Sequence, residues 1–446
     1  SEASARKLSA EAGELRARVE AAEEAAAAAA AAAEAEAEEE VSTGAPDDPK
    51  PLRVSFGEGV SDSSGPPSLY STGRSYRSEL SEALHARRSI TFASEMEDTD
   101  DDIATFSHDV VGTYSCHGQE PGPDGGVGKI NQDCACLAHP FANMRGTGLF
   151  CVYDGHGKLG HDVSQEVLHF VYQELEENSD ELLLDPGNTL ANTFMRCNEH
   201  LVKMLGEEPI EVDARDSGTC AVVCFVQGRE LWVAGVGDCR AVVGSQAADG
   251  TLLAVALTTD HKADLPAEQA RIESMGGYVR PTFEDDGEFM PARVYEFQGR
   301  PWLGPGLCVA RALGDLEGVR CGIIPTPEVC THTVQEEDLF LILASDGVWE
   351  FIENEEAVRI VRLFHEQGKP ALDACRFLIA KAALLWRTNE GQYRDDITAI
   401  VVYLRPVVQG LEAEVSTGRE RTTSVAGSAR GQVAAMAPLA EEAEVA

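Results

Sequence analysis

Acidic residues stand beside strand-like apolar runs at several separate places in this sequence. Asp154 directly follows the run Leu149–Tyr153, Asp346 comes just after Leu339–Ala344, and each is followed by glycine. Carboxylates brought together without cations repel one another and become protonated. Hard oxygen donors of this kind suit Mg²⁺ or Mn²⁺. The pattern therefore predicts a divalent-metal centre, and the further aspartates at the edges of apolar runs are Asp133, Asp238, Asp395 and Asp396.

Each of these aspartates taken alone is also explained as a turn residue, because Asp-Gly is a common turn dipeptide. The same arrangement in five separated segments favours the metal interpretation, since strand ends can converge at one edge of a sheet. Glycine after the acid, as at Gly155 and Gly347, lets the backbone turn sharply and lets a main-chain carbonyl face the same centre.

Two basic residues near these acids have types suited to phosphate chemistry. His156 comes two residues after Asp154, and a histidine titrates near neutrality and can act as a general acid. A third metal ligand or a structural histidine is the alternative. Lys129 precedes Asp133 by four residues and is a candidate cation for a substrate phosphate, or else a solvated strand residue.

The elements that must position these residues are apolar runs alternating with helical stretches. The hairpin turn expected at Gln227-Gly228 and the paired helical stretches favour an α+β fold over strict βαβ alternation. Expected strands are Leu149–Tyr153, Ala221–Val226, Glu230–Val236, Leu339–Ala344 and Ile397–Leu404. Expected helices are Val163–Glu177, Thr189–Leu205, Pro266–Met275, Glu355–His365 and Ala371–Trp386.

The composition divides the chain into four segments. Residues 1–40 are rich in Ala and Glu and predict a solvated helix or disorder, because their heptad pattern is too short for a coiled-coil scaffold. Residues 41–102 are rich in Ser, Gly, Pro and Arg and predict a disordered linker. Residues 103–410 are expected to form the catalytic domain, and residues 411–446 a disordered tail.

The formal net charge of −40 argues against binding to nucleic acid or to anionic lipid, which both need a basic surface. The 12 cysteines lack the spacing of a disulfide framework, so we expect reduced thiols and an intracellular protein, cytoplasmic or nuclear. Cys134-Ala-Cys136 is too close for a zinc knuckle and predicts a strand. No apolar run reaches membrane-spanning length, and a monomer is expected.

A glycine-rich segment from Gly122 to Lys129 comes near to a nucleotide-binding phosphate loop. It misses the spacing by one residue and has Ile130 where Ser or Thr would hold Mg²⁺, so we interpret it as a loop.

The motifs together resemble those of the metal-dependent Ser/Thr protein phosphatases of the protein phosphatase 2C-like (PPM) family. They occur in the family's order and cover about residues 108–405. The matching stretches are Lys-Ile-Asn-Gln-Asp133, Phe-Cys-Val-Tyr-Asp154-Gly-His-Gly, Asp216-Ser-Gly-Thr, Val-Gly-Asp238-Cys-Arg, Ala-Arg-Ala-Leu-Gly-Asp315, Ala-Ser-Asp346-Gly-Val-Trp and Arg-Asp395-Asp-Ile-Thr.

The resemblance implies a central antiparallel β-sandwich flanked by helices on both sides, a four-layer αββα fold, with a binuclear Mg²⁺/Mn²⁺ centre. It implies that Asp154 bridges two metals, that the Gly155 carbonyl binds one, and that Asp346 and Asp395 bind the other. Asp133 would act through metal-bound waters, Asp238 would serve a third, weaker metal, His156 would be the general acid, and residues 266–306 would form a flap that shapes substrate choice.

The implied activity is hydrolysis of phosphoserine and phosphothreonine in protein substrates by a metal-activated water, without a protein nucleophile. Gln132 stands where many members have Glu, and Lys129 where many have Arg. Lysine binds phosphate as a point charge rather than through two parallel bonds. A catalytically weak pseudophosphatase that acts as a binding or regulatory module is the alternative, although the predicted metal-binding acids are all present.

Overall fold

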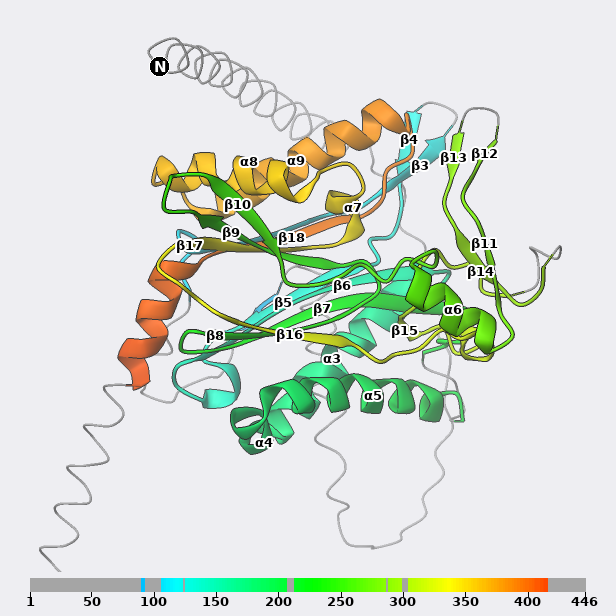
Figure 1. The fold of residues 1–446 in the computed structure, drawn as a ribbon, viewed down its shortest axis with the longest axis horizontal. Coiled ribbons are helices and arrows are strands. Elements are labelled where there is room, and N and C mark those ends of the chain that lie inside the picture. Colours follow the sequence, from blue (N-terminus) through cyan, green and yellow to red (C-terminus); the bar gives the residue numbers. More distant parts are fainter. Residues whose placement is uncertain are drawn as a thin grey trace, which may run out of the picture. The chain divides into compact units, whose positions relative to one another are not determined.

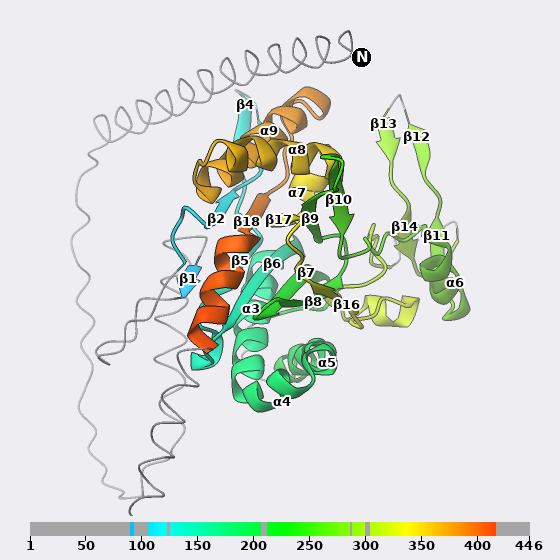
Figure 2. The same cartoon turned by 60° about the vertical axis from the view of Figure 1, so that its left-hand side comes forward.

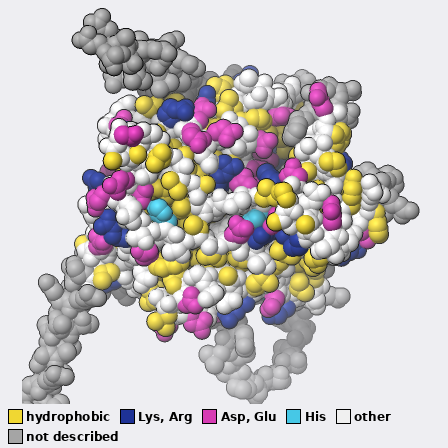
Figure 3. Space-filling model, viewed as in Figure 1, with side chains coloured by type: hydrophobic (Ala, Val, Ile, Leu, Met, Phe, Trp, Pro, Cys, Tyr) yellow, Lys and Arg dark blue, Asp and Glu magenta, His cyan; other side chains and the backbone are white. Residues whose placement is uncertain are grey.

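The structure is a computed structural model that describes residues 90–92, 106–122, 125–206, 212–285, 288–298 and 304–415, all within one compact unit of the chain. The predictions for residues 1–40 and 416–446 lie outside the described residues, as do those for most of 41–102. No helix among the described residues is long and apolar enough to cross a membrane. Acidic and basic side chains are interspersed over the face shown in Figure 3.

The first of two large sheets has seven strands, in the order β1-β5-β6-β7-β8-β16 with β15 paired to β7. Its neighbours pair antiparallel except β1, which is parallel to β5. The strands are β1 (Ile90–Phe92), β5 (Asp133–Ala138), β6 (Thr147–Gly157), β7 (Ser217–Gln227), β8 (Glu230–Val236), β15 (Leu313–Gly314) and β16 (Glu328–Thr333).

The second sheet has five strands in the order β10-β9-β17-β18-β2, all antiparallel. Its strands are β2 (Val111–Cys116), β9 (Arg240–Gln246), β10 (Leu252–Ala256), β17 (Asp338–Ala344) and β18 (Ile397–Tyr403).

Side chains from the two sheets meet in a central core. Phe150 and Val222 of the first sheet pack in the same buried cluster as Leu341 and Ile400 of the second. Helices cover the outer faces, so the central strands are buried on both sides. This explains why they are continuous apolar runs rather than alternating ones.

One helical layer covers each sheet (Figure 1). The first sheet packs against α3 (Gly160–Glu177), α4 (Ser179–Leu184) and α5 (Pro186–Met204). The second sheet packs against α8 (Asn354–Glu366) and α9 (Ala371–Asn389). The predicted four-layer αββα arrangement is confirmed.

The strands and helices expected from the sequence are all present, with bounds shifted by a few residues. Gly228 has a φ of 60° in the β7–β8 hairpin, as expected of a tight turn. Cys134 and Cys136 lie in β5, and all 12 cysteines are free thiols. The segment around Gly122 forms an antiparallel hairpin of β3 (Gln119–Gly122) and β4 (Gly125–Gly128), not the strand-loop-helix unit of a phosphate loop.

The expected flap segment contains a helix and paired strands beside the sandwich (Figure 2). It contains α6 (Pro266–Ser274) and two antiparallel strand pairs, and Ile272, Val279 and Val294 are buried together. The Arg280 guanidinium lies over the ring of Phe283 at 4.6 Å. The four strands are β11 (Tyr278–Arg280), β12 (Phe283–Asp285), β13 (Glu288–Met290) and β14 (Arg293–Tyr295).

Two predicted boundaries differ from the structure. The domain end expected at residue 410 falls inside a helix over residues 404–415, in which Leu411 is fully buried against the central core. The Gly146 amide also donates to the Glu414 carboxylate. The folded part therefore includes residues 411–415, and β1 likewise falls inside the segment expected to be a linker.

Candidate metal centre

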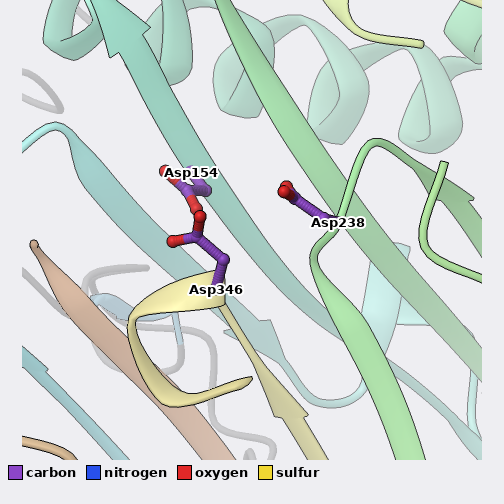
Figure 4. Close-up of side chains that lie close together, drawn as sticks. All are labelled: Asp154, Asp238 and Asp346. Atoms are coloured by element: carbon purple, nitrogen blue, oxygen red, sulfur yellow. The ribbon is translucent and has the colours of Figure 1, made fainter. Parts of the chain in front are cut away.

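Three aspartates from both sheets bring their carboxylates together. Asp154 belongs to β6, Asp238 lies in the turn between β8 and β9, and Asp346 is the first residue of α7 (Asp346–Trp349), which follows β17. One oxygen of each carboxylate lies within 4.8 Å of those of the other two. Figure 4 shows the carboxylates of Asp154 and Asp346 next to each other, with Asp238 approaching from a neighbouring turn. Three of the five segments predicted to converge thus bring their acids together.

Close backbone packing explains the glycines beside these acids. At Gly347 an added Cβ would lie 2.0 Å from the main-chain oxygen of Asp396, so only glycine lets α7 pack against the start of β18. At Gly155 an added Cβ would lie 2.3 Å from the carbonyl oxygen of Gly160. Gly237, next to Asp238, has a φ of 79°, which favours glycine.

Asp133 of β5 is the register partner of Asp154 in the β5–β6 strand pair. Its Oδ2 accepts a 2.7 Å hydrogen bond from the Ser345 hydroxyl, which ties it to the residue before Asp346. Its Oδ1 is buried and has no hydrogen-bond partner. Burial, followed by the charge of Asp396, raises the pKa of Asp133. A buried carboxylate oxygen without a donor is what a bound cation or its water would satisfy.

The acids before β18 have different roles. Asp396 is buried and accepts hydrogen bonds from the amides of Gly118 and Gln132, so it fixes the loops that surround the centre. Asp395 is more exposed, and its Oδ1 accepts from the Lys129 ammonium at 2.5 Å. Its charge helps to raise the pKa of Asp154.

The donor set fits divalent cations. Among the described residues no salt bridge from Lys, Arg or His reaches Asp133, Asp154 or Asp346. Burial and the neighbouring carboxylates raise the pKa values of Asp154 and Asp346. Negative charge that is neither paired nor solvated favours cation binding, and all the donors are oxygens, as Mg²⁺ and Mn²⁺ prefer.

His156 is held by a partner that sequence reasoning missed. Its Nε2 lies 2.6 Å from Oδ2 of Asp315, which is 3% exposed. Burial lowers the pKa of His156, but the charge and hydrogen bond of Asp315 raise it more, so the pKa lies above the usual value. Asp315 stood in the Ala-Arg-Ala-Leu-Gly-Asp stretch, but no local signal joined it to the histidine.

Lys129 lies among acids rather than in solvent. Its ammonium is 2.5 Å from Asp395 and 3.5 Å from Asp396, and its side chain is largely buried. The Tyr393 ring centroid lies 6.0 Å away. The interpretation of Lys129 as a solvated strand residue is therefore wrong, and the ammonium lies beside one of the predicted metal-binding acids.

A second lysine, also missed from the sequence, pairs with Asp238. The Lys262 ammonium lies 2.5 Å from Asp238 Oδ2. Burial raises the pKa of Asp238, but this lysine lowers it more, so the net shift is downward. Lys262 comes between β10 and α6, and no local pattern links it to Asp238.

Gln132, the first departure from the family's pattern, makes hydrogen bonds to neighbouring residues. Its side-chain Nε2 donates to the carbonyl of Gly157, the residue after His156, at 2.7 Å. Its own carbonyl accepts from the Gly155 amide at 3.2 Å and from the Ser164 hydroxyl at 2.6 Å. Gln132 therefore stabilises the end of β6 that carries Asp154 and His156.

Comparisons with known proteins identify a family and related chains. Residues 131–389 match the family model described as Protein phosphatase 2C. Probable protein phosphatase 2C 34 of Arabidopsis thaliana is 33% identical over 287 residues, which cover 61% of this chain and 77% of the relative. Probable protein phosphatase 2C 72 of Arabidopsis thaliana is 31% identical over 317 residues, which cover 66% and 92%.

A solved structure, serine-threonine phosphatase 2C from Toxoplasma gondii, superposes with a TM-score of 0.54 at 22% identity, covering 66% of this chain and 94% of that one. This similarity shows a shared fold. The resemblance first inferred from ordered motifs is thereby confirmed, and the chain belongs to the protein phosphatase 2C family of metal-dependent protein phosphatases.

Proposed function

We propose that this enzyme hydrolyses phosphoserine and phosphothreonine in protein substrates at a binuclear Mg²⁺ or Mn²⁺ centre. The observation that supports this most directly is the approach of the Asp154 and Asp346 carboxylates, which have oxygens within 4.8 Å of each other beside Asp238. The similarity to named protein phosphatases supports the reaction class.

The residues proposed to hold the cations come from both sheets. Asp154 would serve both ions, and the presence of Asp133 across the strand pair and Asp346 beside it supports this assignment. We assign the Gly155 carbonyl to one ion and Asp346 with Asp395 to the other. Asp133, anchored by Ser345, would act through water on its unpartnered oxygen.

When bound, Mg²⁺ or Mn²⁺ supplies Lewis acidity, which makes water a nucleophile at neutral pH and offsets the charge of a phosphoryl group. His156 is proposed to protonate the leaving serine or threonine oxygen. Because Nε2 is hydrogen-bonded to Asp315, Nδ1 is the ring nitrogen that remains to donate that proton. Lys129 is proposed to place positive charge beside the substrate phosphate while it holds Asp395.

The alternative of a catalytically weak regulatory module has no observation in its favour. Asp133, Asp154, Asp346 and Asp395 are all retained, and His156 has an acidic partner. A protein that only bound partners would gain nothing from a buried cluster of carboxylates, which is costly to maintain.

The test uses phosphoserine and phosphothreonine peptides with the full chain in Mn²⁺, in Mg²⁺ and in EDTA. We expect phosphate release only with metal, and a loss of about 100-fold or more in Asp154→Asn. Asp249→Asn, at an exposed turn position, is the matched control and should keep full activity. Equal rates with metal and with chelator would exclude this function.

A further inference from the structure

The Asp238 carboxylate already has a cation supplied by the protein. Lys262 Nζ lies 2.5 Å from Asp238 Oδ2, and the Asp238 side chain is only 6% exposed. Because this carboxylate is buried, the ammonium on Oδ2 offsets its charge without help from solvent. Asp238 therefore differs from Asp154 and Asp346, the other two members of the cluster.

The backbone holds Lys262 beside this acid. The neighbouring His261 amide donates to the carbonyl of Gly237, the residue before Asp238, at 2.8 Å. Lys262 itself pairs with Val309 in an antiparallel bridge. The lysine is thus tied to the same turn that carries its partner, so the contact does not depend on the flexible side chain alone.

The formal charges of the centre match two divalent cations once the lysines are included. Lys262 neutralises one acid and Lys129 another, while the Asp315 carboxylate is paired separately with His156. The four negative charges that remain equal the charge of two divalent ions. The six acids counted are Asp133, Asp154, Asp238, Asp346, Asp395 and Asp396.

We propose that Lys262 is the resident cation of Asp238 and takes the place of a third divalent ion in this centre. The inference rests on the proposed metal-dependent function. It assigns Asp238 to positioning Lys262 rather than to direct metal binding, in contrast to the role that the family resemblance implied. A divalent ion at Asp238 would have to share this carboxylate with an ammonium whose backbone is held beside the same turn.

The experiment measures Mn²⁺ bound per chain, by equilibrium dialysis and calorimetry on the full protein. We expect two ions for the parent protein and for Lys262→Arg, which keeps the charge. Lys262→Met, which has similar length but no charge, is expected to bind one ion more. Lys203→Met on the surface of α5 is the matched control and should bind two.

Asp238→Asn gives a second test that does not require the Lys262 variants to fold. We expect it to keep two bound ions per chain. Loss of an ion in this variant, three ions in the parent protein, or unchanged stoichiometry in a folded Lys262→Met protein would overturn the proposal. If the parent protein bound no Mn²⁺, the proposed function itself would fail, so the two failures are distinguishable.

Discussion

Nε2 of His156 lies 2.6 Å from Oδ2 of Asp315, although 159 residues separate them in the chain. Asp315 has a φ of 47°, a conformation uncommon outside glycine. Gly218 makes room for it, since an added Cβ there would lie 2.2 Å from the Asp315 carboxylate. A carboxylate in this position orients the imidazole and stabilises its protonated form.

Asp315→Asn is therefore expected to lower kcat by about 10-fold to 100-fold while leaving Mn²⁺ affinity unchanged. Asparagine keeps the shape of the side chain but not the charge that holds the imidazolium. Peptide hydrolysis and Mn²⁺ calorimetry on the same samples check the two effects separately.

Because Asp315 acts through His156, the effects on kcat of substituting the two residues should not be additive. His156→Gln is expected to lower kcat at least as far, and the double variant to be no slower than His156→Gln alone. Independent effects that multiply, or a loss of bound Mn²⁺ in Asp315→Asn, would show that Asp315 has another role.

Gly347→Ala is expected to destabilise the fold by about 1–3 kcal/mol, because its Cβ would lie 2.0 Å from the Asp396 carbonyl oxygen. The substitution displaces Asp346, so weaker Mn²⁺ binding should accompany it. Urea unfolding measures the first effect. Gly410→Ala, where an added Cβ meets nothing within 4 Å, is the control and should leave the fold as stable or more so.

The ion pairs of Glu268 should make stability depend on pH. Its side chain is 6% exposed, and it accepts hydrogen bonds from Arg311 and Arg271. Burial raises its pKa, but the two guanidinium groups lower it more, so its folded pKa lies below the usual value. The charged form therefore adds stability above the unfolded pKa, and this is lost as the pH falls through the folded pKa.

Glu268→Gln is expected to cost about 1–3 kcal/mol of unfolding free energy at neutral pH. The difference from the parent protein should shrink as the pH falls below about 4. Urea unfolding over a pH series checks this. Glu356→Gln, which removes an exposed pair with Lys381, should change stability by less than about 1 kcal/mol. A difference that stayed constant with pH would refute the electrostatic explanation.

The thiols should react according to their burial. Only Cys116, Cys308 and Cys330 are partly exposed, and the other cysteines are buried. Burial also raises the pKa of Cys308, which disfavours the reactive thiolate. We expect no more than these three to react with a thiol reagent in the native protein, and all 12 after unfolding without reductant. A smaller number after unfolding would reveal disulfides.

The sequence predicted best those elements that are buried on both faces. β7 and β17 are long apolar runs because sheet and helix cover them, and such runs are visible without a structure. β16 was missed because it is a largely exposed edge strand, in which Glu328, Thr331 and Thr333 break any apolar pattern. Residues 411–415 were assigned to a tail because their burial depends on contacts with the central core.

The acids proposed to bind metal could be found because each lies beside an apolar run and has a recognisable local context. Their basic and acidic partners could not. Lys262 contacts Asp238 from 24 residues further along the chain, and Asp315 contacts His156 from 159 residues further along. Neither contact leaves a local pattern, because both exist only when the strands are brought together.

The proposed metal centre takes residues from both sheets of the sandwich: Asp154 comes from the first sheet, whereas Asp346 follows a strand of the second. The distances between its ligands therefore depend on the position of one sheet relative to the other. Catalytic geometry tolerates errors of only about 0.5 Å. The apolar side chains between the sheets, such as Val222 and Leu341, thus hold the two parts of the proposed site in position. A substitution among them can slow turnover without altering any polar atom.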